Sequence, residues 1–105
     1  MKEVKTVYIA GKITGDPNYR KKFERAQRKL EEAGFTVLSP ATLPDGVFSY
    51  DTYMRLSSEK LDASDAVYFL PDWKDSRGAM FEFGRAVALG KQIINGIDVI
   101  EEASE

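Results

Sequence analysis

The sequence of 105 residues contains no cysteine and no histidine. Without cysteine, the chain forms neither disulfide bonds nor thiolate zinc sites. Without histidine, it lacks the commonest general base and the commonest ligand of transition metals, and a Ser-His-Asp triad is impossible. We therefore expect no metal centre and no cofactor, and carboxylates and hydroxyls remain as the candidate catalytic groups.

Long apolar runs and a surplus of positive charge are absent as well. No apolar stretch approaches the length of a membrane span, and the N-terminal segment MKEVKTVYIAG predicts a strand rather than a signal peptide. The net charge of −2 argues against nonspecific attraction to nucleic acid or anionic membranes. We expect a cytoplasmic protein that binds neither a nucleic acid polymer nor a membrane.

Length and composition predict a single domain over residues 1–105. Hydrophobic residues make up 43% of the chain and charged residues 30%, which suffices for one modest core and not for two. The sequence has no internal repeat, low-complexity tract or linker.

Four short apolar segments predict β-strands. Each is bounded by glycine, proline or polar residues, and the third is apolar throughout, as expected for a strand buried on both faces. The segments are Val4–Ala10, Phe35–Leu38, Ala66–Leu70 and Lys91–Asn95. The last ten residues predict either a further short strand or a frayed helix.

Three segments with helical periodicity alternate with these strands. They are Tyr19–Ala33, Ser49–Ala63 and Ser76–Leu89, and Gly34 and Gly90 follow the first and third. The residues expected to face inward are Phe23, Ala26, Leu30 and Ala33 in the first helix, and Tyr53, Leu56 and Leu61 in the second.

This alternation predicts a three-layer α/β fold of the flavodoxin or Rossmann-like type, with a parallel sheet of four to five strands and helices on both faces. A strand order of 2-1-3-4 places the ligand crevice between the carboxyl ends of the first and third strands. The loops Gly11–Asn18 and Pro71–Gly78 meet there. Both are rich in glycine, hydroxyl and charged residues.

Glu82 stands among apolar residues near the predicted start of the third helix. At 100° per residue it flanks the apolar stripe of that helix. We expect a partly desolvated carboxylate whose ionisation is favoured by the positive end of the helix. Such a group suits a nucleophile or general base facing the crevice. The alternative is a surface carboxylate paired with Arg85 or Lys12.

The N-terminus of this helix is a candidate anion site. Ser76 is a good N-cap, and Gly78 allows a ligand to approach the first turn closely. The free N–H groups and the helix dipole there both favour negative charge. Arg77 and Asp75 adjoin this position as further substrate-binding candidates. The alternative is that Ser76 serves only as a cap.

Three more side chains are candidates, each with a structural alternative. The Tyr8 hydroxyl can reach the crevice, or its ring packs in the core. Lys12 can bind a phosphate as a point charge, or it is a solvated loop residue. Trp73 can stack on a base, or it fills the gap beside the third strand.

Several better-known sites are not indicated. Asp72, Asp75 and Glu82 form too sparse a carboxylate set for Mg²⁺. Gly11 and Gly15 form GxxxG, which is neither the dinucleotide fingerprint nor the phosphate-binding P-loop. The acidic pair that a phospho-receiver domain needs after its first strand is also absent.

Three stretches, YIAGKITG, SDAVYFLPDW and DSRGAMFEFGRAVALGK, resemble the nucleoside 2-deoxyribosyltransferase-like superfamily. The closest branch is the small, often phage-associated DUF4406 group, and the deoxynucleoside 5′-monophosphate N-hydrolases are a sister branch. The resemblance covers Tyr8 to Lys91. It implies a flavodoxin-like fold and a reaction in which Glu82 attacks the anomeric carbon of a 2-deoxyribosyl N-glycoside.

The resemblance also implies roles for other residues. Tyr8 lies near this Glu, Gly11 lines the ribose pocket, and Ser76 and Gly78 contact the 5′ end of the substrate. A serine at Ser76 is typical of the monophosphate hydrolases, whereas the nucleoside-specific transferases carry an aspartate there. One residue departs from the family pattern, because Ser57 stands where an aspartate that handles the base is usual. Nearby Glu59 is a possible substitute.

Members of the superfamily are usually dimers or larger, so we expect a homodimer built partly on the second helix. The aromatic residues for such an interface are Phe48, Tyr50 and Tyr53. Three functional hypotheses remain open. The first is an N-glycosidase or deoxyribosyltransferase that acts on deoxynucleoside 5′-monophosphates or deoxynucleosides. The second is a nucleotide-binding module with little turnover, and the third is a phage interaction protein that retains only the fold.

Overall fold

The computed structural model describes residues 3–95, which form a four-stranded parallel sheet. The strands are β1 (Thr6–Ala10), β2 (Thr36–Leu38), β3 (Ala66–Phe69) and β4 (Gln92–Asn95). Their order is β2-β1-β3-β4, as the sequence predicts. The further strand or frayed helix expected for the last ten residues lies outside the described residues.

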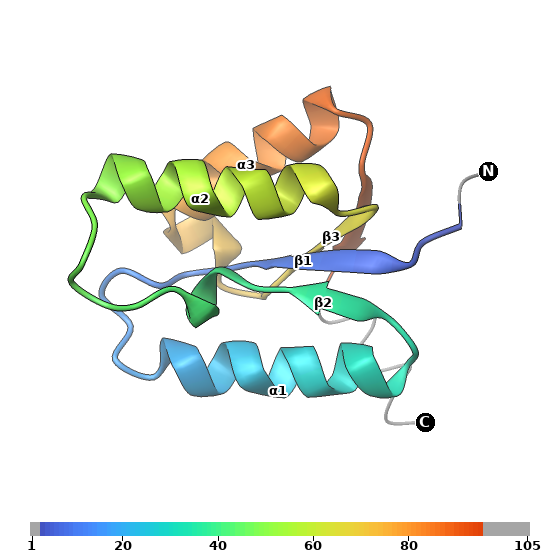
Figure 1. Ribbon diagram of the computed structural model, residues 1–105, viewed down its shortest axis with the longest axis horizontal. Coiled ribbons are helices and arrows are strands. Elements are labelled where there is room, and N and C mark those ends of the chain that lie inside the picture. The colour runs from blue at the N-terminus through green and yellow to red at the C-terminus, as the bar shows by residue number, and fades with distance from the viewer. Residues whose placement is uncertain (1–2, 96–105) are drawn as a thin grey trace.

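Three helices cover the two faces of the sheet. Helix α1 (Tyr19–Glu32) lies on one face, and helices α2 (Tyr50–Ala63) and α3 (Arg77–Ala88) lie together on the other (Figure 1). Two single 3₁₀ turns follow strands, η1 (Pro40–Thr42) after β2 and η2 (Trp73–Asp75) after β3. This is the expected three-layer α/β arrangement. None of the described helices combines the length and the apolar run needed to cross a membrane.

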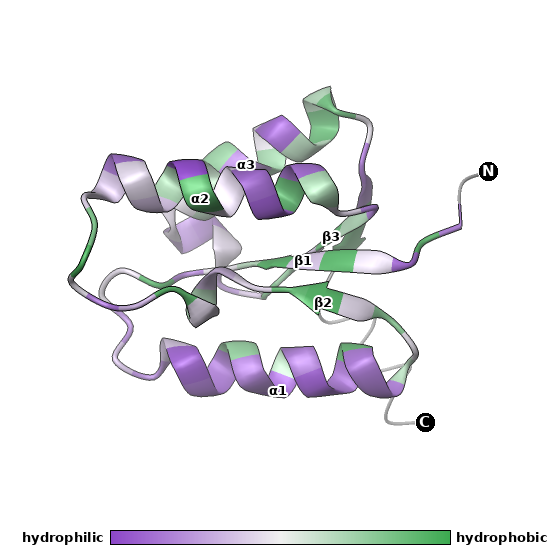
Figure 2. Cartoon of the chain, in the orientation of Figure 1, coloured by the Kyte–Doolittle hydropathy of each residue, from purple (hydrophilic) through white to green (hydrophobic). Residues whose placement is uncertain are grey.

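The side-chain alternation along β1 separates the core into two parts. Val7 and Ile9 pack towards α1, whose buried side is narrow and whose outer side is strongly hydrophilic in Figure 2. Tyr8 and Ala10 point to the opposite face and pack among residues of α2 and α3. The period of two residues therefore places the Tyr8 side chain on the same face of the sheet as α3.

Two expectations about buried positions are corrected. Ala33 is exposed rather than part of the α1 stripe, because α1 ends at Glu32 and the chain turns through Gly34 at a φ of 100°. In α2, Leu61 is fully buried, but Tyr53 and Leu56 are only partly buried. Their half of α2 borders a cavity instead of the sheet.

Candidate active site

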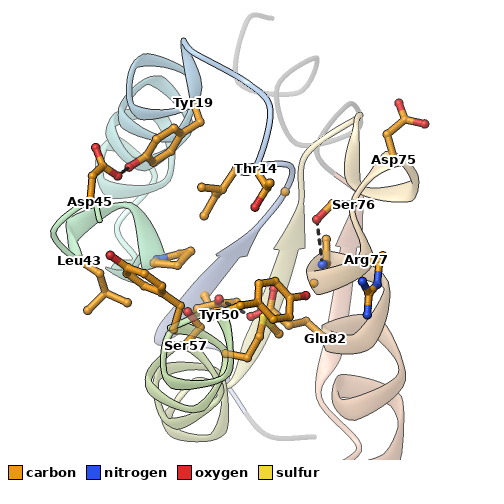
Figure 3. Close-up of a pocket in the computed structure, with 18 of the residues that line it drawn as sticks. Thr14, Tyr19, Leu43, Asp45, Tyr50, Ser57, Asp75, Ser76, Arg77 and Glu82 are labelled. Carbon is orange, nitrogen blue, oxygen red and sulfur yellow. Dashed lines mark hydrogen bonds between the residues drawn. The ribbon is translucent and has the colours of Figure 1, made fainter. Parts of the chain in front are cut away.

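A cavity of about 500 Å³ lies beyond the carboxyl ends of β1, β2 and β3 (Figure 3). This volume is typical of sites for small molecules, and the position agrees with the crevice expected from the strand order. The residues that line it are Tyr8, Gly11, Ile13, Thr14, Tyr19, Pro40, Leu43, Asp45, Gly46, Tyr50, Tyr53, Met54, Ser57, Asp75, Ser76, Arg77, Gly78, Ala79 and Glu82.

Glu82 is the buried carboxylate of this cavity, with 5% of its surface exposed. It projects from the second turn of α3 towards β1, where the Tyr8 hydroxyl donates a hydrogen bond of 2.5 Å to its Oε2 atom. The surface pairing considered as an alternative does not occur, because Arg85 binds Asp62 at 2.7 and 2.6 Å. The resemblance implies that Tyr8 lies near Glu82, and the hydrogen bond between them agrees with this, although the Tyr8 ring is also part of the core.

The second oxygen of Glu82, Oε1, is available to a ligand. The hydrogen bond from Tyr8 occupies Oε2, and no side-chain polar atom that is fully buried in the described part of the chain lacks a hydrogen-bond partner. Because Glu82 lines the cavity and Oε1 has no hydrogen-bond partner among residues 3–95, this oxygen has access to the cavity. A carboxylate oriented by one oxygen and free at the other has the geometry of a nucleophile.

Burial raises the pKa of Glu82 to about 7, and the hydrogen bond from Tyr8 opposes this shift. The sequence predicts instead that the helix N-terminus favours ionisation. That expectation is corrected, because desolvation of a nearly enclosed carboxylate disfavours its charged form more than the hydrogen bond from Tyr8 favours it. Glu82 therefore titrates close to neutral pH, where a catalytic acid or base is most useful.

Ser57 of α2 adjoins Tyr8. Its side chain is buried and lines the cavity. Burial, followed by the charge of Glu82, raises the pKa of Tyr8 well above its usual value, and the contact with Ser57 opposes the rise. Tyr8 thus stays protonated and donates to Glu82. Glu59, the possible substitute for the usual aspartate, lies on the exposed side of α2 and does not line the cavity. Its Oε1 atom is 3.7 Å from Nη1 of Arg55.

The N-terminus of α3 forms one end of the cavity. The Ser76 hydroxyl accepts a hydrogen bond of 3.1 Å from the Ala79 backbone N–H, as expected for an N-cap. Gly78 packs closely against α2, because a Cβ atom at this position would lie 3.1 Å from Sδ of Met54. Arg77 is exposed beside the Tyr50 ring, whose centroid lies 5.9 Å from its guanidinium carbon.

Asp75 and Gly11 also reach the cavity. The Asp75 carboxylate is exposed and points away from the centre of the cavity in Figure 3. A Cβ atom on Gly11 would lie 2.6 Å from Cδ1 of Leu70, so only glycine fits between the end of β1 and the end of β3.

Two of the predicted binding residues are absent from the cavity wall. The Trp73 ring stacks on the Phe83 ring, with 4.9 Å between the ring centroids and 15° between the ring planes, and it packs against Phe69. Trp73 thus fills a packing gap beside β3, which is the structural alternative to stacking on a base. Lys12 binds the neighbouring loop through its backbone, with its N–H donating to Oδ1 of Asp72 at 3.1 Å. Neither side chain is among those that line the cavity.

The segment after β2 contributes residues that the sequence does not single out. Leu43, Asp45 and Gly46 line the cavity, and the Tyr19 hydroxyl donates a hydrogen bond to Asp45. The available signal is topological, because the loop after β2 leaves the same edge of the sheet as the two glycine-containing loops. Within residues 3–95, no group of three acidic side chains is close enough together to hold a metal ion.

Comparison of the sequence with models of protein families identifies the family of the chain. Residues 5–95 match the model of a domain of unknown function, DUF4406. The chain belongs to this family. No curated protein matches the sequence.

Solved structures with the same fold include enzymes of nucleoside metabolism. A 2-deoxyribosyltransferase from Leishmania mexicana is 23% identical, with a TM-score of 0.69 over 87% of this chain and 63% of the enzyme. A 2-deoxyribosyltransferase from Bacillus psychrosaccharolyticus is also 23% identical, with a TM-score of 0.68 over 86% and 70% of the two chains. The CMP N-glycosidase BcmB of Clostridium botulinum is 27% identical, with a TM-score of 0.65 over 87% and 70%.

These matches confirm the resemblance to the nucleoside 2-deoxyribosyltransferase-like superfamily and its fold. The DUF4406 chain spans less than two thirds of the length of the Leishmania enzyme.

Proposed function

We propose that this DUF4406 protein is an N-glycosidase or deoxyribosyltransferase that acts on deoxynucleoside 5′-monophosphates. The observation that carries the proposal is the buried Glu82 carboxylate, which Tyr8 orients through Oε2 and whose Oε1 faces a cavity of about 500 Å³. The related folds of two deoxyribosyltransferases and a CMP N-glycosidase support the same reaction class.

In the proposed reaction, Oε1 of ionised Glu82 attacks the anomeric carbon of the sugar. The bond from this carbon to the base nitrogen breaks, its electron pair leaves with the base, and a glycosyl ester forms on Glu82. Water or a second base then attacks the same carbon, the proton that it loses passes to the nitrogen of the departed base, and the carboxylate is regenerated. The hydrogen bond from Tyr8 keeps Oε2 occupied, so that one oxygen alone points to the sugar.

The 5′-phosphate is assigned to the α3 end of the cavity. The free N–H groups of the first helical turn, the Ser76 hydroxyl and the Arg77 side chain lie there, and all are compatible with an anion. An aspartate at position 76 would oppose such a ligand, and this chain has a serine. A nucleotide bound in this way places its sugar near Glu82 and its base towards the segment that follows β2 (Figure 3).

The test is a panel of nucleosides and nucleotides, with release of the free base followed by chromatography. Release from at least one deoxynucleoside 5′-monophosphate, abolished in Glu82→Gln, supports the proposal. A protein without turnover on every member of a panel that covers the common bases and both sugars contradicts it.

A second function, nucleotide binding without efficient turnover, is favoured by one residue. The position at which the superfamily usually has an aspartate is occupied by Ser57, which is buried and lines the cavity. No described carboxylate replaces it, because Glu59 pairs with Arg55 on the outer side of α2. Thermal stabilisation by nucleotides without any release of base distinguishes this function.

The homodimer suggested by the resemblance remains part of the proposal. The aromatic residues expected to form it are partly engaged within the chain. Phe48 and Tyr53 pack edge to face at 5.5 Å, and the Tyr53 hydroxyl donates to the Pro44 carbonyl. A larger exposed apolar surface lies on the outer side of α3, with Met80, Phe81 and Val87 each about half exposed.

A further inference from the structure

Asp45 provides a fixed negative charge at the end of the cavity remote from the α3 N-terminus. Figure 3 places Asp45, Leu43 and Tyr19 on one side of the cavity and Ser76 and Arg77 on the other. If the phosphate occupies the α3 end, as the proposed function requires, this opposite end faces the base.

The Asp45 carboxylate is held in place by two residues at the start of α1. The Tyr19 hydroxyl donates to its Oδ1 atom, and the Arg20 guanidinium lies 3.2 Å from its Oδ2 atom. The hydrogen bonds from Tyr19 and Arg20 lower the pKa of Asp45, so that it is ionised at neutral pH. An ionised carboxylate only accepts hydrogen bonds, and its two oxygens have room for further donors.

The neighbouring hydroxyl groups already donate their protons to the protein. The Tyr19 hydroxyl proton is directed at Asp45, and the Tyr53 hydroxyl donates to the Pro44 carbonyl. Tyr53 also accepts a hydrogen bond of 3.2 Å from the Val47 backbone N–H. The hydroxyls of Tyr19 and Tyr53 therefore have no proton to offer to a carbonyl group of a ligand, and the Asp45 carboxylate presents an acceptor.

We propose that Asp45 accepts a hydrogen bond from the exocyclic amino group of the base, which makes it the specificity-determining residue for amino-bearing nucleotides. Cytosine and adenine carry an amino donor at the position where uracil, thymine and hypoxanthine carry a carbonyl acceptor. Uracil keeps one donor, N3–H, but its two flanking carbonyl oxygens face the same carboxylate and are repelled by it. The inference rests on the proposed function, because that function sets the direction of the nucleotide.

A purely structural role for Asp45 gives a different expectation. Its bonds to Tyr19 and Arg20 join the segment after β2 to α1, and Arg20 also donates to the Ala41 and Leu43 carbonyls. Loss of a structural clamp weakens the binding of all nucleotides by a similar factor. Loss of a base-reading group changes the ratio between an amino-bearing nucleotide and its carbonyl counterpart.

The experiment measures calorimetric dissociation constants for dCMP and dUMP, and for dAMP and dIMP, with the Glu82→Gln variant so that no turnover occurs. One of the two pairs, dCMP and dUMP or dAMP and dIMP, will bind more tightly overall. Within that pair, a charge-assisted hydrogen bond predicts that the amino-bearing nucleotide binds at least about tenfold more strongly than its carbonyl counterpart. Adding Asp45→Asn should reduce this preference to within about threefold, because an amide can turn either its oxygen or its NH₂ group to the base.

Asp51→Asn in the same background is the matched control, since Asp51 is exposed in the first turn of α2 and outside the cavity wall. It should keep the full preference. If the Glu82→Gln protein with Asp45 unchanged binds dUMP and dIMP as strongly as dCMP and dAMP, or more strongly, the inference is overturned and the proposed function is left intact. A preference that survives Asp45→Asn also overturns it. If none of the four nucleotides binds, the inference fails, and the base-release panel decides separately whether the proposed function fails with it.

Discussion

The Tyr8 hydroxyl and Oε2 of Glu82 are joined by a hydrogen bond of 2.5 Å, although the two residues are 74 positions apart in the chain. Each residue alters the titration of the other. The hydrogen bond from Tyr8 partly offsets the burial that raises the pKa of Glu82, and the charge on Glu82 adds to the burial that raises the pKa of Tyr8. The pair therefore combines a permanent donor with a carboxylate that ionises near neutral pH.

Glu82→Gln should abolish base release while nucleotide binding persists, because the amide keeps the shape of the side chain and still accepts from Tyr8. Glu82→Ala leaves space beside the anomeric carbon, and formate or acetate should restore part of the activity. Chromatographic assays of both variants with added carboxylate check this. A Glu82→Gln protein that turns over at near wild-type rates contradicts the proposed mechanism.

Glu82→Gln should also stabilise the fold above neutral pH. The pKa of Glu82 is about 7 in the folded state and 4.5 for an ordinary glutamate, so the carboxyl group takes up a proton on folding between these values. Its contribution to stability therefore falls as pH rises through this window. The difference in unfolding free energy between the variant and the wild type should approach about 3 kcal/mol above pH 7, at about 1.4 kcal/mol per pKa unit.

Urea unfolding of both proteins from pH 4 to pH 8 measures this difference. The two proteins should have similar stability near pH 4, where the carboxyl group is protonated in the folded and unfolded states. A constant difference over the whole range would show that Glu82 does not titrate within it.

Tyr8→Phe should shift the pH dependence of kcat/KM to higher pH. In the wild type, activity should rise through about pH 7 as Glu82 ionises. A hydrogen bond to a charged group contributes roughly 1.5–3 kcal/mol. Its removal should therefore move the pH at which kcat/KM rises upward by about 1–2 units. Tyr68→Phe is the control, because Tyr68 is a buried tyrosine of the other core cluster, and its profile should match the wild type.

Ser76→Asp should weaken the binding of deoxynucleoside 5′-monophosphates at least about tenfold while the unphosphorylated nucleosides change little. Aspartate is itself a good N-cap, so α3 should remain intact. Ser49→Asp is the matched control, because Ser49 caps α2 in the same way and lies outside the cavity wall. Binding is measured by calorimetry. A wild-type protein that prefers the plain nucleoside would instead favour the transferase branch.

Sedimentation at micromolar concentration tests the homodimer. The expected result is a dimer, and a protein that sediments only as a monomer contradicts this prediction. Phe81→Glu and Tyr50→Glu then show whether the apolar side of α3 or the aromatic end of α2 forms the interface. Lys21→Glu, on the exposed side of α1, is the control and should not alter the assembly.

Periodicity and strand order were sufficient to predict the sheet, and residue type predicted the helix cap at Ser76. The proximity of Tyr8 to Glu82 was implied by the resemblance alone, because the residues themselves left core packing of the Tyr8 ring open as an alternative. The depth at which Glu82 is buried was not predictable, because it depends on how closely α2 packs against α3. Asp45 was missed for another reason. Its segment has no periodicity, and only the folded chain brings it to Tyr19. Trp73 was ambiguous because an aromatic residue in a loop suits both a ligand and a packing gap.

The contact between Gly78 and Met54 limits the width of the cavity between α2 and α3. Because α3 has no side chain at Gly78, the Met54 thioether closes the space between the two helices, and a Cβ atom would lie 3.1 Å from its sulfur. Met54 is flexible and unbranched, so shorter side chains at this position can widen the chamber while Tyr8 and Glu82 keep their places. Met54 thus narrows the cavity from α2 at the point where α3 carries no side chain, and a graded series from Met54→Leu to Met54→Ala offers a way to admit bulkier sugars.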